Sequence, residues 1–561
     1  MMGRKRVSNL LGTRFYDLLD YLILFITAAS IIIFILWPIA SVIKQSIIID
    51  GRFSFEMYKS IFVESKRLIG NGIFVALLST VFSTIVSVYV SLYISFSKGW
   101  LSKLLFSILL FTMISPPFVS SLAYINLFGR RGFITHDILG LTLNTYGWYG
   151  IVIMQTLSHV SLNSIILFGV IKGIDKNIIN ASLDCGAGVN YTIRKVIIPM
   201  MKSGIVVAAL LTFVRCLSDF GTPMIIGGSF NTLATQIYLE IIAYADFSRA
   251  AAMNVLLFIP SVLVFIIYRF YLKKANSSYE GNTKNSSMDM VFKFNGFLGN
   301  FIKGITYLFI IVMLLQYFSI FLSAITEYRK GTMYFSLANI LKLKNYSISS
   351  FKRSIVYSLI AGIVGSFIGI LTAYYTDRRK IKGMKTIDFI ATLPYIIPGT
   401  FFGIGYIFAF KDYPLELTGT AAIVVLNCIY KQLPMTTKAS SAVLSTINPQ
   451  IEDAARDAGA KNFFVLKDII MPSMKPAFLT GFINNFTATM TTIGSIIFLI
   501  YPGQKVATLE MFDAIQSGDY GLGSVIACII IIITLFVNIL FSKLVYGGKN
   551  VFKTNRLSQR V

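Results

Sequence analysis

The chain has 561 residues, of which 55% are hydrophobic and 13% are charged. A soluble protein of this length needs a more polar surface, so the composition excludes an ordinary soluble fold and predicts a polytopic membrane protein. The formal net charge of +25 suggests a nucleic-acid partner, but the basic residues lie in clusters between apolar runs. Such clusters are typical of loops at a membrane surface. We therefore expect the chain to contact a lipid bilayer and no nucleic acid.

The apolar runs define the predicted helices. A transmembrane helix needs about 20 mostly apolar residues, and the chain contains about twelve such runs. In the first half they lie near residues 21–47, 71–95, 102–127, 148–170, 204–226 and 250–271. In the second half they lie near residues 301–324, 354–375, 386–409, 418–437, 477–500 and 521–543. The first run exceeds a signal-peptide core and lacks a small-residue cleavage site, so we interpret it as a retained helix. The predicted fold class is an all-α polytopic membrane protein.

Basic residues give the expected orientation. They cluster at the N-terminus, after every second run and after the last run. Counting the runs places these clusters on one side, which the positive-inside rule makes cytoplasmic. Both termini are then cytoplasmic in a multi-pass protein, which we expect in the cell membrane of a bacterium. The polar stretch KKANSSYEGNTKNSSMD, 273–289, is typical of a flexible linker. The predicted domains are 1–272 and 296–561, joined by a cytosolic linker over 273–295.

Two inner loops repeat one pattern. We name residues 174–202 the first inner loop and residues 447–475 the second inner loop. The first contains ASLDCGAGVNYTIRKVIIP and the second contains AARDAGAKNFFVLKDIIMP. A shift of 273 residues superimposes Gly186 on Gly459 and Pro199 on Pro472, and the interval from glycine to proline is 13 residues in both. The same shift brings Asp246 onto Asp519, which indicates a duplicated six-helix unit.

Each inner loop is predicted to form a short helix, a glycine turn and a second short helix. The first helices should cover residues 174–185 and 447–458, with Asp175 or Asn448 as the N-cap and the glycine ending the helix. The alternative is an amphipathic connector on the lipid surface, which the lysines of both loops also suit. Two copies with one spacing argue against it, because a connector at the interface needs no fixed interval.

The motif DAARDAGA at 453–460 resembles the Glu-Ala-Ala-x-x-x-Gly signature of permease subunits of binding-protein-dependent ABC importers, with Asp453 for the glutamate. The motif NASLDCGA at 180–187 is a degenerate copy, which leaves open whether both loops bind equally. The resemblance implies two homologous six-helix permease units, which bind two copies of a cytosolic ABC ATPase and an extracytoplasmic substrate-binding protein. The residues that it assigns to ATPase coupling are Asn180, Ala181, Gly186, Ala187, Pro199, Asp453, Ala454, Ala455, Gly459, Ala460 and Pro472.

Nucleotide and metal chemistry are not expected in this chain. It contains no GxxxxGK[ST] motif, so the backbone cradle for nucleotide phosphates is missing. The resemblance then places ATP and Mg²⁺ on the partner ATPase, and we expect no enzyme and no cofactor here. Two histidines and four widely spaced cysteines do not predict a zinc site. We expect the cysteines to be unpaired packing residues.

The run SDFGTPMIIGGSFNTLATQIY, 218–238, and the fused layout resemble the ferric-iron import permeases. The resemblance implies Fe³⁺ as the cargo, a hard cation that prefers carboxylate and phenolate oxygen. Related permeases for 2-aminoethylphosphonate, thiamine or polyamines remain alternatives. An ion-coupled secondary carrier is an alternative of a different class, since such carriers also use duplicated halves. The paired inner loops disfavour it, because a carrier has no ATPase to bind.

Some polar residues are candidates for the transport pathway. Asp219 lies far inside the fifth run, where an acid is costly and therefore a functional candidate. Arg215 precedes it by one helical turn, and Thr492 occupies the corresponding position of the second half. The alternative for Asp219 is an acid bonded locally at the break that Gly221 and Pro223 create. For the outer gate or the docking of the binding protein we expect Tyr238, Glu240, Asp246 and Asp519, with a solvated outer loop as the alternative.

Overall fold

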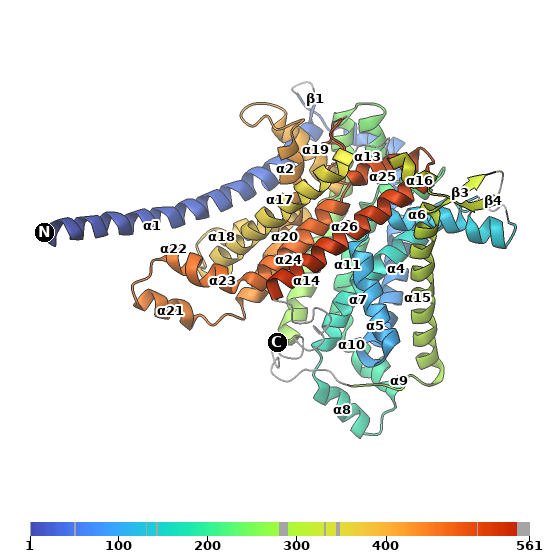
Figure 1. The fold of residues 1–561 in the computed structure, drawn as a ribbon, viewed down its shortest axis with the longest axis horizontal. Helices are drawn as coiled ribbons and strands as arrows, with labels where there is room; N and C mark the ends of the chain where they lie inside the picture. The colour runs from blue at the N-terminus through green and yellow to red at the C-terminus, as the bar shows by residue number, and fades with distance from the viewer. Residues whose placement is uncertain are drawn as a thin grey trace. The chain divides into compact units, whose positions relative to one another are not determined.

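The computed structural model describes residues 2–49, 52–130, 132–141, 144–279, 290–329, 332–343, 348–501 and 503–546. This part of the chain is almost entirely helical, with two short antiparallel hairpins (Figure 1). It divides into two compact units, and we describe each unit by itself. Unit 1 contains the described residues within 1–45, 349–506 and 534–551. Unit 2 contains those within 46–348 and 507–533.

Unit 2 holds most of the first half of the sequence. Its strands are β1 (Ile48–Ile49), β2 (Arg52–Phe53), β3 (Thr326–Arg329) and β4 (Thr332–Phe335). Its longer helices are α3 (Glu56–Glu64), α4 (Lys66–Phe96), α5 (Trp100–Ile114), α6 (Phe118–Phe128), α7 (Trp148–Lys172), α8 (Lys176–Asp184), α11 (Lys202–Leu217), α13 (Leu233–Ile242), α14 (Phe247–Tyr279), α15 (Gly296–Ala324) and α25 (Ala507–Gln516). Its shorter helical segments are η2 (Phe133–Ile138), α9 (Val189–Thr192), η3 (Ile193–Ile197), α10 (Ile198–Met200), α12 (Gly221–Ile226) and α16 (Ala338–Lys342).

Unit 1 holds the N-terminal helix and most of the second half. Its longer helices are α1 (Met2–Ile31), α17 (Ile348–Ala373), α18 (Met384–Thr392), α19 (Gly399–Phe410), α20 (Ala421–Leu444), α21 (Gln450–Asp457) and α24 (Lys475–Thr491). Its shorter segments are η1 (Ile32–Leu36), η5 (Tyr374–Arg378), η6 (Leu393–Tyr395), α22 (Asn462–Phe464), η7 (Val465–Ile470) and α23 (Met471–Ser473). The helices α2 (Trp37–Ile47) and α26 (Tyr520–Tyr546) begin in one unit and end in the other.

The helices agree with the predicted polytopic fold. Seven helices of the described chain are long and apolar enough to cross a membrane, and three bent pairs raise this number to 10. The third predicted run of each half is bent at its prolines, by 110° between α5 and α6 and by 117° between α18 and α19. The two remaining predicted runs coincide with α20, which carries Lys431 and Lys438, and with α24, which has 17 residues. About twelve helices therefore fit the predicted spans.

The compact units do not follow the two sequence halves, because the first helices are exchanged. In unit 1, α1 packs against α18 and α22, and the Tyr406 hydroxyl donates to the Phe34 carbonyl at 2.8 Å. In unit 2, α15 packs against α4 and α6, and the Tyr317 and Ser115 hydroxyls are 2.9 Å apart. The boundaries at 272 and 296 thus remain a prediction about the sequence repeat. Part of the predicted linker, 280–289, lies outside the described residues.

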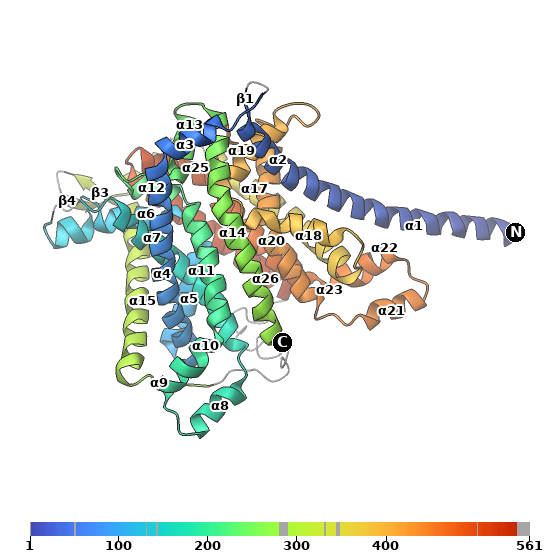
Figure 2. The same ribbon diagram turned by 180° about the vertical axis from the view of Figure 1, so that it is seen from behind.

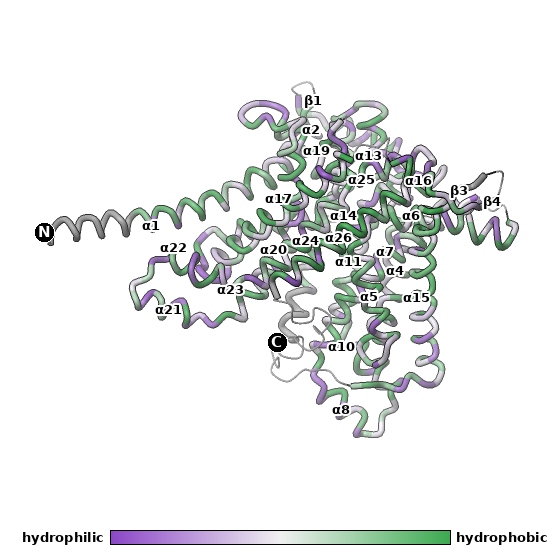
Figure 3. Tube along the Cα trace, in the orientation of Figure 1, coloured by the Kyte–Doolittle hydropathy of each residue, from purple (hydrophilic) through white to green (hydrophobic). Residues whose placement is uncertain are grey.

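Apolar residues cover the long helices, and hydrophilic residues gather at helix ends and in α8 and α21 (Figure 3). Several polar residues within the helices bond internally, as hydrocarbon favours. The Ser87 hydroxyl donates to the carbonyl of Ser83 at 2.6 Å, and the Asn163 amide donates to the Thr212 hydroxyl at 2.7 Å between α7 and α11. The equivalent positions of α20 and α24, 273 residues later, hold Thr436 and Asn485. The same pair of residue types is therefore exchanged between the two helices.

A stripe of glycines lets α17 approach α20 and α24 closely. A Cβ atom on Gly362 would lie 2.7 Å from the Phe482 ring, and one on Gly365 would lie 2.2 Å from the Asn485 amide nitrogen. A Cβ atom on Gly369 would lie 2.8 Å from Thr436. No real side chain tolerates such distances without moving its neighbour, so these glycines serve close packing.

We predict that Gly365→Val destabilises the protein, because the added side chain overfills the contact with Asn485. The expected cost is about 1–3 kcal/mol, measured as a lower thermal unfolding temperature of the detergent-purified protein. Gly304→Val is the matched control, since nothing lies within 4 Å of a Cβ atom at that exposed position of α15. Equal unfolding temperatures for the two variants would contradict the packing role.

Candidate functional site: two inner loops and the polar residues of the helices

The two inner loops begin with the same capping interaction. The Asp175 carboxylate accepts a hydrogen bond from the backbone N–H of Asn177 at 2.9 Å, at the start of α8. The Asn448 side-chain oxygen accepts one from the backbone N–H of Gln450 at 3.0 Å, at the start of α21. Each interaction satisfies an N–H group that has no partner within its helix. Asp175 is therefore the N-cap of α8 as predicted, whereas Asn448 makes the same bond one residue before Pro449, the N-cap of α21.

The glycine turns also follow the prediction. Gly186 and Gly459 have φ angles of +82° and +90°, in the left-handed region that favours glycine. In the first loop, the N–H of Ala187 donates to the Ser182 carbonyl at 3.1 Å. In the second, the N–H of Ala460 donates to the Ala455 carbonyl at 2.9 Å. In each loop the N–H of the glycine also donates to the carbonyl three residues earlier. The two hydrogen bonds of each loop form one Schellman turn.

The exposed faces of α8 and α21 match at the same register. Ile178 is 44% exposed and Ile451, at the equivalent position, is 51% exposed. The same face continues three and seven residues after each isoleucine, where the residues are small and exposed. These residues are Ala181 and Cys185 in the first loop and Ala454 and Ala458 in the second loop. Residues with this spacing lie on one side of a helix. We name the two sets the apolar ridges, 178/181/185 and 451/454/458.

The loops stand beyond the ends of the long helices of their own units. Figures 1 and 2 show α8 beyond the ends of α5 and α7, and they show α21 and α22 on segments that leave α20 and α24. Nothing in the described chain lies within 4 Å of a Cβ atom built on Gly186 or Gly459. Pro199 and Pro472, which are predicted to take part in coupling, are exposed at the return to α11 and α24. Each loop therefore presents an open surface.

The buried faces of the two loops differ. In the first loop Ile179 is fully buried and packs with Ile193 and Ile197, and the Ser182 and Thr192 hydroxyls are 2.9 Å apart. In the second loop the residue equivalent to Ile179 is Glu452, which is 2% exposed and pairs with Arg378. Asp453, the residue in place of the signature glutamate, lies 3.1 Å from Arg456 on the surface, whereas its equivalent Asn180 is simply exposed.

Asp219 is bonded locally at the break between α11 and α12. One carboxylate oxygen accepts the backbone N–H groups of Gly221 at 3.0 Å and Thr222 at 3.1 Å. The other accepts the Gln155 amide at 3.1 Å, and the Gln155 oxygen accepts the Ser79 hydroxyl at 3.0 Å. Both oxygens are thus used to hold the break. This is the local alternative that the sequence offered, and direct contact with a cargo stays a prediction.

Sequence reasoning missed the partners of Asp219. Gln155 lies on α7 and is almost fully buried, and His159 follows it by one turn with its ring nitrogen 2.8 Å from the Gln155 carbonyl. A buried amide on a spanning helix was the available signal, since such groups need a partner. Arg215 is exposed one turn before Asp219, and Thr492 ends α24 at the corresponding place in unit 1.

Most of the predicted outer residues form hydrogen bonds or ion pairs within unit 2. Asp246 and Asp519 accept the backbone N–H groups of Arg249 at 2.9 Å and Leu522 at 3.2 Å, so they are equivalent N-caps of α14 and α26. Glu240 is 6% exposed and lies 3.4 Å from Arg249. These acids therefore have structural partners.

Tyr238 is also packed against a neighbouring side chain. It stacks on Phe220, with the ring centroids 5.5 Å apart. Burial raises the pKa of the Tyr238 phenol, and the nearby carboxylate of Asp513 raises it further. The phenol is therefore protonated at neutral pH.

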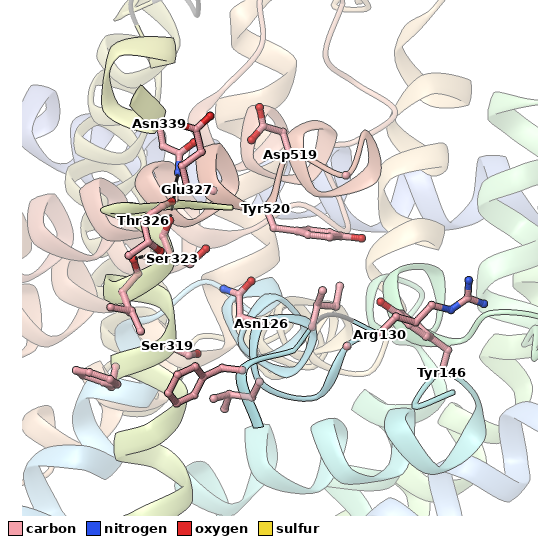
Figure 4. A pocket seen from close by; sticks show the side chains of 18 of the residues that line it. Asn126, Arg130, Tyr146, Ser319, Ser323, Thr326, Glu327, Asn339, Asp519 and Tyr520 are labelled. Atoms are coloured by element: carbon pink, nitrogen blue, oxygen red, sulfur yellow. Dashed lines mark hydrogen bonds between the residues drawn. The ribbon is translucent and has the colours of Figure 1, made fainter. Parts of the chain in front are cut away.

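Asp519 also lines a cavity of 1040 Å³ near the C-terminal end of α15. In Figure 4, Asp519 and Glu327 lie on one side of this cavity, Arg130 and Tyr146 lie on the other, and Tyr520 and Asn126 lie between them. Asp519 is paired with Lys342 at 2.9 Å. Within the residues that the structure describes, no group of three or more His, Cys, Asp or Glu side chains could hold a metal ion.

Repeated sets of bent and straight spans, each with an open loop closed by a glycine turn, define the membrane subunit of a transporter. The chain belongs to the family described as binding-protein-dependent transport system inner membrane component, which matches residues 83–277 and 365–546. Each match contains one inner loop. The chain is thus a transport permease of the ABC importer family with two permease units, and the secondary-carrier alternative is disfavoured.

Individual relatives extend this result. The chain is 28% identical over 515 residues to the ferric transport system permease protein FbpB of Actinobacillus pleuropneumoniae, covering 87% of this chain and 72% of that protein. It is 29% identical over 505 residues to a Haemophilus influenzae protein provisionally named ferric transport system permease protein FbpB 1, covering 85% of this chain and 77% of that protein. The sulfate transport system permease protein CysT of Salmonella typhimurium is 24% identical over 208 residues, which are 35% of this chain and 74% of that protein. This shorter relative therefore matches about a third of this chain.

We predict that Asp219→Ala destabilises the protein, because two backbone N–H groups and the Gln155 amide lose their acceptor. Leaving buried donors unsatisfied costs about 1–3 kcal/mol, which thermal unfolding in detergent would report as a lower midpoint. Asp184→Ala is the matched control, since Asp184 is exposed at the end of α8. If both variants unfold at the wild-type temperature, Asp219 does not hold the break.

Proposed function

We propose that this chain forms the complete transmembrane pathway of an ATP-driven importer for ferric iron. The observation that carries the proposal is the pair of inner loops, which share one cap, one glycine turn and one exposed face at a register of 273 residues. A surface that occurs twice with the same geometry suits two identical partners. Two copies of a cytosolic ABC ATPase meet this requirement, and they would hold the ATP and Mg²⁺ for which this chain has no phosphate loop.

The apolar ridges are the proposed contact with the ATPase. Each ridge offers one exposed isoleucine, Ile178 or Ile451, followed by small residues that allow close approach. A helix that lays such a face into a groove buries its apolar side chains at i, i+3 and i+7. Asn180 and Asp453 lie beside the ridges, so their difference alters the edge of the contact and leaves its centre unchanged.

The external side of the chain would receive its cargo from a substrate-binding protein, as the family description implies. We propose docking at the exposed turn between Glu240 and Asp246, where Ile242 is 56% exposed and Tyr244 is 67% exposed. The predicted acids would support this turn through their caps and ion pairs. From the positive-inside pattern we propose that both termini lie in the cytoplasm of a bacterial cell.

Ferric iron is favoured as the cargo because two relatives that cover most of the chain carry ferric transport in their names. Permeases for phosphonates, thiamine or polyamines remain the alternatives. For the pathway we propose Asp219, Arg215 and Thr492, with Asp219 acting through the shape of the helix break, since its oxygens already have donors. An acid in only one of the two units makes this pathway asymmetric.

We predict that Gly459→Asp abolishes ATP-driven uptake while the protein still inserts into the membrane. The left-handed conformation costs a non-glycine residue roughly 1–2 kcal/mol, and the new carboxylate projects into the proposed contact. Co-purification of the ATPase and uptake in cells are the measurements.

The matched control for that variant is Gly383→Asp, which has the same φ of +90° and the same open surroundings but lies before α18. It introduces the same strain and the same charge outside residues 447–475 of the second inner loop. If Gly459→Asp binds the ATPase and transports like Gly383→Asp, the coupling assignment is wrong.

For the cargo, we predict that deleting this subunit lowers the uptake of radioactive ferric iron, and that the intact chain restores it. Uptake of 2-aminoethylphosphonate, thiamine and a polyamine should not change in the same cells. Unchanged iron uptake with a loss of one of the other compounds would replace ferric iron by that compound and would leave the importer assignment intact.

A further inference from the structure

The N-terminal helix α1 carries two acids in a segment that is long and apolar enough to span a membrane. Asp17 and Asp20 lie one turn apart, and the span covers Phe15–Ile47. Asp20 is only 2% exposed. A buried carboxylate at such a place is retained only when it is paired and hydrogen-bonded. The partners of these acids therefore show what α1 is built to contact.

Both acids point to the second inner loop and the helix end beside it, all within unit 1. Asp20 pairs with the Arg379 guanidinium and accepts the Tyr375 hydroxyl at 3.2 Å. Asp17 lies 3.3 Å from the Lys461 ammonium, at the start of α22. The preceding residue, Tyr16, packs on Phe464 and Phe463 of α22, with ring centroids 4.6 Å and 5.9 Å apart.

The neighbouring arginine, Arg378, binds α21 of the second inner loop. Arg378 pairs with Glu452 of α21 and donates to the Ile447 carbonyl at 2.6 Å. Glu452 also lies 3.4 Å from Arg456, one turn further along α21. The side chains of both Arg378 and Arg379 are only 14% exposed. Consecutive arginines at the end of η5, which follows α17, thus contact two different elements, since Arg378 holds α21 and Arg379 holds α1.

The first inner loop is attached by different chemistry. The positions equivalent to Glu452 and Arg456 hold Ile179 and Leu183, which pack in an apolar cluster with Phe292 and Phe294. Within residues 174–202, all of which the structure describes, no ion pair anchors the loop. The charge network is therefore specific to the second loop.

We propose that Arg378 and Arg379, with Asp17, Asp20 and Glu452, join α1 to the second inner loop so that the two move as one body during transport. This inference rests on the proposed function, in which α21 receives the movement of an ATPase. The helices α1 and α2 lead into the rest of the first half of the sequence. The network therefore connects the proposed ATPase contact of the second inner loop with the first permease domain of the sequence. The arginines are positioning residues, and they do not touch the cargo.

The first test measures iron transported per ATP hydrolysed by the reconstituted complex of chain, ATPase and binding protein. Asp17→Lys, at the partly exposed pair, should lower this ratio by about fivefold or more while the ATPase still binds. Adding Lys461→Asp should restore it, because the exchanged charges attract again. Asp388→Asn is the matched control, since Asp388 pairs with Lys438 in the same unit and this pair includes no residue of α1 or of the loop. An unchanged ratio in Asp17→Lys, or no rescue by the exchange, overturns the proposal.

The second test is a covalent link between α1 and the loop. With Tyr16→Cys and Phe464→Cys in a chain whose four native cysteines are replaced by serine, oxidation should form a disulfide and leave iron uptake within about twofold of the reduced protein. A body that moves together tolerates such a link. Loss of uptake on oxidation, recovered by reduction, would show that the two elements must separate, and failure to form the link would show that they are not neighbours. Either result contradicts the proposal.

These tests separate the proposal from the function on which it rests. If Gly459→Asp leaves ATPase binding and uptake intact, the proposed function itself is wrong. If Gly459→Asp blocks uptake while the Asp17 variants and the covalent link behave against expectation, only the joint between α1 and the second loop is wrong.

Discussion

Hydrocarbon offers no hydrogen-bond partner to a polar group, and the rest of this structure depends on that constraint. Within the spanning helices, serine hydroxyls return to backbone carbonyls, Asn163 meets Thr212, and Asp219 receives three donors. Unpaired polar groups are costly in hydrocarbon, which favours such internal bonds. The polar residues that stay open to solvent gather at helix ends and in the inner loops, where a soluble partner can reach them.

The same constraint explains how the two inner loops can be equal outside and unequal inside. Their exposed faces share the glycine turn and the isoleucine position, and this surface is set by local backbone geometry. Their buried faces are filled either by Ile179 or by Glu452 with an arginine. Replacing a buried ion pair by apolar packing is often neutral for stability. The degenerate first motif therefore changes the edge of the proposed contact and the attachment of the loop, and it leaves the turn intact.

Much of this architecture follows from the sequence, because it depends on local rules. Apolar run length predicted the spans, and capping residues and glycines predicted the loop helices. The shift of 273 residues predicted that Asp246 and Asp519 are equivalent, but only the structure shows that both are caps. The exchange of first helices could not be predicted, because hydropathy does not say which helix a lipid-facing helix contacts. The pairing of Asp20 with Arg379 joins residues 359 positions apart, and no local pattern reveals it. Asp219 could be recognised as unusual, but only the geometry shows that its oxygens are used by the helix break.

We propose that ATP hydrolysis on a partner drives ferric iron through this chain. The most direct measurement is iron accumulation in vesicles that contain the chain and its ATPase, with ATP inside and the iron-loaded binding protein outside. We expect that iron accumulation requires ATP, Mg²⁺ and the binding protein. We also expect that it continues after ionophores collapse all ion gradients. Accumulation by the chain alone, driven by a proton or sodium gradient without the ATPase, would contradict it.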